Sequence, residues 1–443
     1  MEKVEILNIS NILITSIGLM ILYVLVLFKR KKYSDPFLRK SIIRAFTFKI
    51  FATVLYFLYY FYMFKGGDTF EYFRGILDFK AAFFKYPKDA IASLFQNPED
   101  YSQNIQKIIS TRFYYTSEES LTIKFGAIFG VIFNGSYMTI AFFYSAFAFG
   151  GIWRLFKTIN YIFPEYKKHL AFFILFFPTI VFWSSSITKD SLVMGALGYF
   201  IYSFYQLFIA RKFSLLQILI LFGSMYLIAG IKAYILVALI PALLLWLFLY
   251  YKSLIKNVLL RKLSIPLFTG LLLIMVYEGL NLMNTSDSFK EFTMEEISDN
   301  IVTYNNYLSQ PGLAGSAYNI GVIEPNLKSI ATIFPAAINV TLFRPFLWES
   351  NNIAGYMTSL ESLFTLLFTL YVLLKTGLFK SFSTILKNPF LLFCLIFTLV
   401  FAGAVGMTSG NFGTLARYKI PCLPFYFTML VVLWQTGIAK KSL

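Results

Sequence analysis

Histidine and cysteine are nearly absent from this sequence, which contains one histidine and two cysteines. Cys394 and Cys422 both lie in apolar stretches, so neither a disulfide framework nor a cysteine metal site is indicated. The single His169 excludes a histidine-rich metal centre, which leaves carboxylates as the ligands for any hard divalent cation.

Charged residues are also scarce. They make up 14% of the chain, whereas hydrophobic residues make up 58% and aromatic residues 20%. A soluble protein of this length needs a more highly charged exterior. Runs of about 20 apolar residues, the length that a helix needs to cross a bilayer, recur along the chain. The sequence therefore predicts an all-α, polytopic integral membrane protein.

We expect about eleven transmembrane helices on this criterion. The first apolar run is followed by "KRKK" with no small-residue cleavage site, so it is interpreted as a membrane helix and not as a signal peptide. The expected spans are residues 11–28, 45–64, 127–150, 169–186, 191–209, 213–230, 233–251, 263–281, 356–376, 388–406 and 420–438.

Several functional motifs are missing as well. The sequence has no phosphate-binding P-loop, no dinucleotide-binding glycine motif, no arginine ladder of a voltage sensor and no filter-like sequence of a channel. Few charges fall within the expected spans, which argues against a proton or ion transporter.

Basic residues outnumber acidic ones, giving a net charge of +17. We attribute this excess to basic cytoplasmic loops and not to nucleic-acid binding, because residues 29–44 carry seven lysines and arginines against Asp35 alone. Every second loop, counted from this one, lies on the same side of the membrane and is also basic. Most acidic residues fall in the loops on the other side. The pattern places the N-terminus outside and the C-terminus in the cytoplasm. The abundance of Phe, Ile, Lys and Tyr suggests a bacterium with an AT-rich genome, and the expected location is its plasma membrane.

Two long outer loops are expected, at residues 65–126 and 282–352. The first contains amphipathic stretches such as "EYFRGILDFKAAFF", which suit the membrane interface. The second begins polar and acidic and ends in "IATIFPAAINVTLFRPFLWES", which suits a segment lying on the membrane. We therefore look for function at the outer face.

Asp68 is the first candidate, in "MFKGGDTFEYF" at the exit of the second span. Asp is a favoured N-cap, so it can simply begin the next helix. Alternatively, Gly66 and Gly67 let the backbone turn and let a ligand approach, with Tyr72 on the following turn.

The second candidate is "PTIVFWSSSITKDSL", where Trp183, Lys189 and Asp190 stand beside four hydroxyl residues in a short outer turn. Such a turn needs polar residues, but hydroxyls, an ammonium and an aryl face also suit a sugar or phosphate. Lys232, in "AGIKAY", is either a snorkelling lysine or a further phosphate ligand.

Two later segments add basic residues on the outer side. Arg344 and Trp348 lie in "LFRPFLWES", where the arginine is either an interfacial anchor or an anion ligand. Arg417 and Lys419 lie in "TSGNFGTLARYKIPCLPFY", at the mouth of the last span. Basic residues on the outer side run against the cytoplasmic bias, which indicates an anionic ligand there.

The stretches "GGDTFEYF", "FWSSSITKDS" and "ARYKIPCLPF" resemble segments of the GT-C superfamily, which comprises polytopic, polyprenyl-phosphate-dependent membrane glycosyltransferases. The resemblance implies that Asp68 is the catalytic carboxylate and Arg417 a ligand of the lipid phosphate. Many members have an adjacent acidic pair where this chain has Asp68 alone, so the use of a divalent cation stays open.

The expected activity is transfer of a sugar from a polyprenyl-phosphate donor to a glycan, lipid or protein acceptor at the outer membrane surface, with no nucleic acid involved. Asp68 would act as general base and Asp190 as a second acid or metal ligand. Phosphate would be held by the basic residues Arg417, Lys419, Lys189, Arg344 and Lys232, and sugar would stack on Tyr72, Trp183 and Trp348. An O-antigen or capsular polysaccharide polymerase is an alternative, as is a non-enzymatic flippase or a membrane subunit of a secretion complex.

Overall fold

A computed structural model of the chain describes residues 9–285, 317–321 and 327–439. The elements in these residues are helices, apart from one isolated antiparallel bridge between Ala317 and Asn411. The all-α class expected from the sequence is thereby confirmed.

The chain divides into two compact units, which are described separately. Unit 1 comprises Met1–Ile162 and Ile174–Lys232, and unit 2 comprises Phe163–Phe173 and Ala233–Leu443. The whole of the expected first outer loop, residues 65–126, belongs to unit 1.

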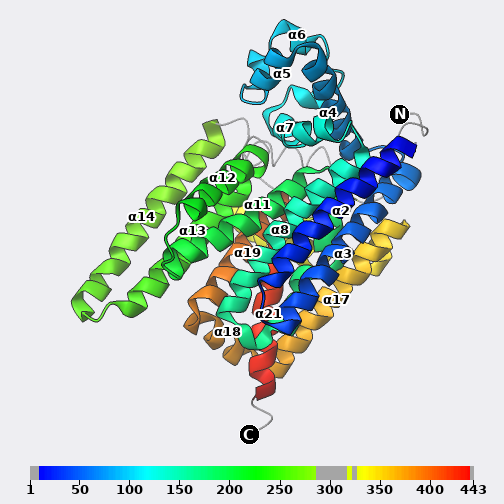
Figure 1. Ribbon diagram of the computed structural model, residues 1–443. Coiled ribbons are helices and arrows are strands. Elements are labelled where there is room, and N and C mark those ends of the chain that lie inside the picture. The colour runs from blue at the N-terminus through cyan, green and yellow to red at the C-terminus, as the bar shows by residue number, and fades with distance from the viewer. Residues whose placement is uncertain (1–8, 286–316, 322–326, 440–443) are drawn as a thin grey trace. The chain divides into compact units, whose positions relative to one another are not determined.

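Long helices form the body of unit 1, with α8 packed against α2, α3 and α11, and with α11 packed against α12 (Figure 1). The start of α3 shows why it forms there, because the Asp35 carboxylate accepts a hydrogen bond from Phe37 N at 2.8 Å and Pro36 occupies the first turn. The long helices are α2 (Ile9–Lys31), α3 (Pro36–Leu58, continued by the π-helical turn Tyr59–Phe64), α8 (Tyr137–Ile162), α11 (Lys189–Phe204, continued by the π-helical turn Tyr205–Ile209) and α12 (Leu215–Lys232).

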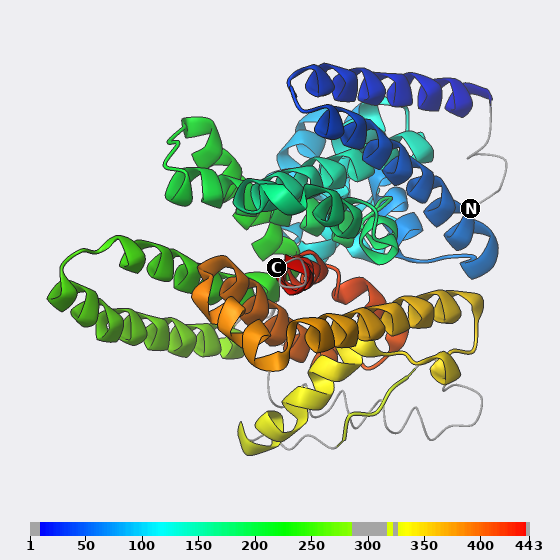
Figure 2. The same ribbon diagram turned by 90° about the horizontal axis from the view of Figure 1, so that it is seen from below.

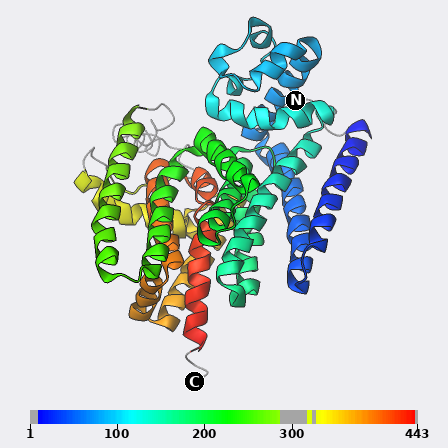
Figure 3. The ribbon, with the colours of Figure 1, turned by 60° about the vertical axis from the view of Figure 1, so that its left-hand side comes forward.

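Shorter helices between α3 and α8 lie together beyond the end of these long helices (Figure 1 and Figure 3). They are α4 (Asp68–Lys85), α5 (Pro87–Ser93), α6 (Gln103–Gln106) and α7 (Ser117–Ile132). One face of α4 is buried through Tyr72, Phe73, Ile76 and Phe79, and the helix packs against α7. The stretch expected to be amphipathic is thus a helix with one apolar face.

Unit 2 is built around α19, which packs against α13, α16 and α21. Neighbouring α13 and α14 run side by side in opposite directions (Figure 1 and Figure 2). The helices of this unit are α13 (Tyr234–Leu254), α14 (Val258–Thr285), α16 (Leu327–Phe343), α17 (Ile353–Thr376), α18 (Leu378–Lys387), α19 (Pro389–Thr408), α20 (Phe412–Tyr418) and α21 (Leu423–Ala439), together with most of α9 (Lys167–Leu175).

Eight helices in the described residues are long and apolar enough to cross a membrane, and a ninth is added if the bent pair Phe412–Tyr418 and Leu423–Ile438 forms one span. These helices support a polytopic membrane protein, but the expected number of eleven spans is not confirmed. α14, which contains the expected span 263–281, is not among the eight.

Two expected spans are interrupted, and a third begins at a bend. Residues 127–150 are divided by a turn in which Asn134 and Gly135 have φ angles of 50° and 73°, so α7 ends before it and α8 begins after it. Residues 169–186 split into α9 and α10 (Pro178–Trp183), because Pro178 begins a new helix. Residues 420–438 belong to the α20–α21 pair, which bends by 70°.

Glycines allow an unusually close approach of α8 and α11. A Cβ atom on Gly151 would lie 1.9 Å from the carbonyl oxygen of Gly195, and one on Gly198 would lie 2.0 Å from that of Gly151. Both distances are below any real contact, so the two backbones touch. Small residues at helix crossings serve this purpose in membrane proteins, where van der Waals packing drives helix association.

We expect Gly151→Ala to destabilise unit 1, because the new methyl group would force α8 and α11 apart. Overpacking of this kind typically costs about 1–3 kcal/mol. The matched control is Gly223→Ala on α12, where no atom lies within 4 Å of the added Cβ. The midpoint of thermal unfolding in detergent should fall for Gly151→Ala and not for Gly223→Ala; equal midpoints for the two variants would contradict the packing argument.

Candidate functional site

Asp68 is the first residue of α4 and is half-buried. The preceding Gly67 has a φ angle of 111°, and a Cβ atom there would lie 2.6 Å from the ring of Tyr60. Only glycine combines this backbone angle with this close approach. The glycine therefore sets the direction in which α4, and with it Asp68, leaves the π-helical turn at the end of α3.

Hydroxyl groups connect the start of α4 to the turn that precedes α11. Thr69 Oγ1 lies 2.8 Å from the Tyr137 hydroxyl and 3.4 Å from Ser186 Oγ, and Tyr137 and Ser186 are 3.0 Å apart. Ser186 N also donates to Ser145 Oγ at 2.9 Å. Since Thr69 follows Asp68 directly, this network fixes Asp68 against the segment that carries Lys189 and Asp190.

The serines of this turn build the structure instead of facing a ligand. Ser184, Ser185 and Ser186 are fully buried. Ser185 Oγ donates to Val181 O at 2.7 Å, and the Ser186 hydroxyl belongs to the network described above. The interpretation that these hydroxyls are offered to a sugar or phosphate is therefore not supported by their burial.

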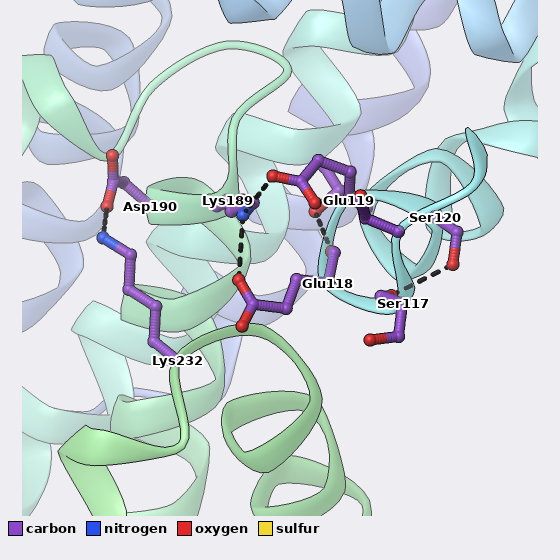
Figure 4. A network of polar contacts seen from close by, with 9 residues as sticks. Ser117, Glu118, Glu119, Ser120, Lys189, Asp190 and Lys232 are labelled. Carbon is purple, nitrogen blue, oxygen red and sulfur yellow. Dashed lines mark hydrogen bonds and ion pairs between the residues drawn. The ribbon is translucent and has the colours of Figure 1, made fainter. Parts of the chain in front are cut away.

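Two ion-pair groups follow this turn at the start of α11 (Figure 4). Lys189 Nζ lies 3.1 Å from Glu118 Oε2 and 2.7 Å from Glu119 Oε1, both on α7. Lys232 Nζ, at the end of α12, lies 2.6 Å from Asp190 Oδ1. The second pair is nearly removed from solvent, with side-chain exposures of 7% for Lys232 and 2% for Asp190. The structure thus brings together three residues that the sequence singled out, Lys189, Asp190 and Lys232.

Both lysines have carboxylate partners inside the chain. The cluster contains two lysines and three carboxylates, so its formal charge is −1. Burial alone would raise the pKa of Glu119, but the charge of Lys189 and hydrogen bonds from Lys189 and Thr116 outweigh it and lower the pKa below its ordinary value. A phosphate that binds either lysine must compete with these carboxylates.

Four further expected site residues lie in unit 2. Arg344 Nε donates to both carboxylate oxygens of Glu349 at 3.1 Å, so its guanidinium already holds an anion. Lys419 is 3% exposed, and its Nζ donates to Ser362 Oγ at 3.4 Å. Arg417 is half-buried on α20, and Trp348 is 80% exposed and stacks on Phe346.

The aromatic residues expected to stack on sugar differ in accessibility. Tyr72 is 2% exposed, and its ring centroid lies 5.2 Å from that of Phe113, so it is closed to a ligand in this structure. Trp183 is half-buried, with an edge-to-face contact to Tyr56 at 6.3 Å. Of the three, Trp348 has the open face that stacking requires.

Sequence reasoning missed Glu118, Glu119 and Lys49. The two glutamates stand in "TSEES", an acidic pair in the first outer loop that was not connected with the lysine 70 residues later. Lys49 is 2% exposed within α3, and its Nζ donates to Val181 O at 2.9 Å and to Ser184 O at 2.6 Å. It thus satisfies carbonyl groups where α10 ends. The sequence feature that could have revealed Lys49 is a lysine inside an apolar run.

Removing one partner of the Asp190–Lys232 pair should destabilise unit 1, because the remaining charge stays buried. Asp190→Asn and Lys232→Met should each cost about 3–5 kcal/mol, and the double variant should cost less than their sum. Midpoints of thermal unfolding of all four proteins in detergent measure this coupling. Additive losses would show that the two side chains do not interact.

Glu119 should give the fold an acid-sensitive contribution. Because its pKa is lowered from 4.5 in the folded chain, the stabilisation is present above about pH 4.5 and is lost as the pH falls through the lowered value. Glu119→Gln should therefore be less stable than the parent near neutral pH and should approach it in acid. The control Glu99→Gln removes an exposed carboxyl and should leave the midpoint near neutral pH unchanged. A constant gap between Glu119→Gln and the parent would contradict the assignment.

Comparisons with protein-family models, curated proteins and solved structures give no match for this chain. No group of three or more His, Cys, Asp or Glu residues is arranged to hold a metal ion among the residues that the structure describes. The functional interpretation therefore depends on the chain's own contacts.

Proposed function

We propose that this protein transfers a sugar from a polyprenyl-phosphate donor to a glycan, lipid or protein acceptor at the outer face of a bacterial plasma membrane. The observation that carries the proposal is the hydroxyl network of Thr69, Tyr137 and Ser186. Through Thr69 and Ser186, this network connects the start of α4, where Asp68 lies, to the turn that carries Lys189 and Asp190. A catalytic carboxylate needs such a fixed position.

Asp68 is proposed as the general base. The acceptor hydroxyl attacks the anomeric carbon of the sugar, the bond from that carbon to the phosphate oxygen breaks, and polyprenyl phosphate leaves with the bonding electrons. Asp68 takes the proton of the acceptor hydroxyl. Its place as the first residue of α4 supports this role, because Gly67 sets the direction in which the helix carries this carboxylate.

The other carboxylates near the turn suit a supporting role. Glu118 and Glu119 bind Lys189, and Asp190 is buried against Lys232. We propose that these pairs position the turn, because carboxylates already neutralise both lysines. Within unit 2, we propose Arg417 as a phosphate ligand, since it is more accessible than Lys419 and Arg344 is occupied by Glu349.

The charge distribution in unit 1 supports the outer location of Asp68. The basic segment Lys29–Lys32 ends α2, and α3 leads from there to α4, so the basic end and the α4–α7 end of the unit are opposite (Figure 1). Cytoplasmic retention of the basic end would put Asp68 outside.

Asp68→Asn should abolish transfer, because the amide cannot accept the proton but has nearly the same shape. We expect a loss of about 100-fold or more in label transferred from radiolabelled polyprenyl-phosphate monosaccharides to acceptors in membranes containing the full chain. The control is Asp100→Asn, which changes an exposed aspartate of the same outer segment.

Normal transfer by Asp68→Asn at equal protein level would overturn the proposed role. Absence of transfer by the parent with every sugar tested would overturn the activity itself. A ladder of products of increasing length, lost together in Asp68→Asn, would assign the chain to polysaccharide polymerisation instead of single-sugar transfer.

A further inference from the structure

A second group of charges lies at the other end of unit 1, away from α4–α7. Lys29 and Lys32 stand at the end of α2, and Arg154 and Lys157 stand on the last turns of α8. Lys29 lies within electrostatic range of the other three. Four positive charges from segments more than 120 residues apart therefore converge on one place, which we call the basic cluster.

Tyrosine rings contact two of these cations, Arg154 and Lys157. The Arg154 guanidinium lies 4.5 Å from the ring centroid of Tyr199 on α11. The Lys157 ammonium lies 5.0 Å from that of Tyr202 and 5.7 Å from those of Tyr33 and Tyr161. Cation–π contacts attract the cations but do not cancel their charge.

Neutralising partners are absent in the part of the chain that the structure describes. No carboxylate there lies within 4 Å of the charged nitrogens of Lys29, Lys32, Arg154 or Lys157. Beside Lys29, the Nε atom of Arg30 is buried and donates no hydrogen bond. The outer cluster of the same unit is the opposite case, because its two lysines contact three carboxylates.

Like charges that converge without counter-charge repel one another. The general bias towards basic residues on the cytoplasmic side explains exposed lysines and arginines such as Arg39, Lys40 and Arg44. It does not explain why Lys29, Arg154 and Lys157 are half-buried, or why Arg154 and Lys157 lie over tyrosine rings of α11 and of the α2 end. A bound anion explains both the convergence and the lack of carboxylates.

We propose that the basic cluster is a binding site for a phosphoryl group. Phosphate oxygens carry the negative charge that several cations can share, the Arg154 guanidinium offers a planar fork to them, and tyrosine hydroxyls add neutral donors. The phosphoryl group belongs either to an anionic phospholipid headgroup or to a phosphate in solution. This site lies at the opposite end of unit 1 from Asp68 and does not depend on the proposed transfer activity.

The test uses the full chain in nanodiscs and measures the midpoint of thermal unfolding in two arms. In the lipid arm, phosphatidylcholine discs are compared with discs that also contain phosphatidic acid or phosphatidylglycerol. In the soluble arm, phosphatidylcholine discs are titrated with inorganic phosphate and with pyrophosphate, with potassium chloride matching the ionic strength. We expect one arm to raise the midpoint saturably.

The test variant is Arg154→Gln with Lys157→Gln, and the control is Arg39→Gln with Lys40→Gln, which removes the same two charges from exposed positions. The test variant should bind the active probe at least roughly tenfold more weakly, and the control should bind it like the parent. Lys157→Gln alone, with an intermediate loss, serves if the double variant does not fold.

Three results would overturn the proposal. The first is a parent protein whose midpoint responds to neither arm beyond the matched chloride. The second is a response that grows without saturation. The third is an equal loss of response in the test and control variants, because that outcome would show that the overall positive charge, and not the basic cluster, attracts the anion.

Discussion

The contact between α8 and α11 at Gly151, Gly195 and Gly198 fixes the positions of both charged clusters in unit 1. The two helices run parallel, since Arg154 contacts Tyr199 and Lys157, further along α8, contacts Tyr202, further along α11. At the other end of the same pair, Tyr137 at the start of α8 bonds Ser186, just before α11 begins. Because side chains are absent at the crossing, the flanking turns are close enough for these polar contacts to form.

The two ends of this helix pair treat their cations in different ways. Lys189 and Lys232 are neutralised by carboxylates, which fixes their positions and makes them poor ligands for another anion. Arg154 and Lys157 contact aromatic rings instead, so they are held in place while their charge remains uncompensated by the protein. The end that carries Lys189 and Lys232 is therefore suited to precise positioning of a turn, and the end that carries Arg154 and Lys157 to attraction of an anion.

Local signals in the sequence were sufficient for much of the fold. Apolar runs identified most of the long helices, and α4 begins at Asp68, as the reading of that residue as a helix start allowed. The Asp35-Pro36 pair was not used, although it is the start of α3. Asn134-Gly135 and Pro178 are helix-breaking signals in the sequence, but an assignment of spans by apolar length alone does not use them. The pairing of Lys189 with Glu118 could not be found in this way, because it depends on how α7 packs beside α11, which no local pattern encodes.

The same limit applies to function, where a residue type indicates a chemistry but its partners decide whether it is available. Lysine beside hydroxyls suggested a phosphate ligand at the 184–190 turn, yet the hydroxyls are buried and the lysine is paired. Breaking such a pair to bind phosphate would leave carboxylates without their counter-charge, which opposes anion binding. Arg154 and Lys157, which the sequence interpreted only as basic residues of the cytoplasmic side, contact no carboxylate in the described residues. Binding of an anion there therefore leaves no carboxylate without its counter-charge. Whether a group of cations in a membrane protein can bind an anion therefore depends less on their number than on whether carboxylates or aromatic rings contact them.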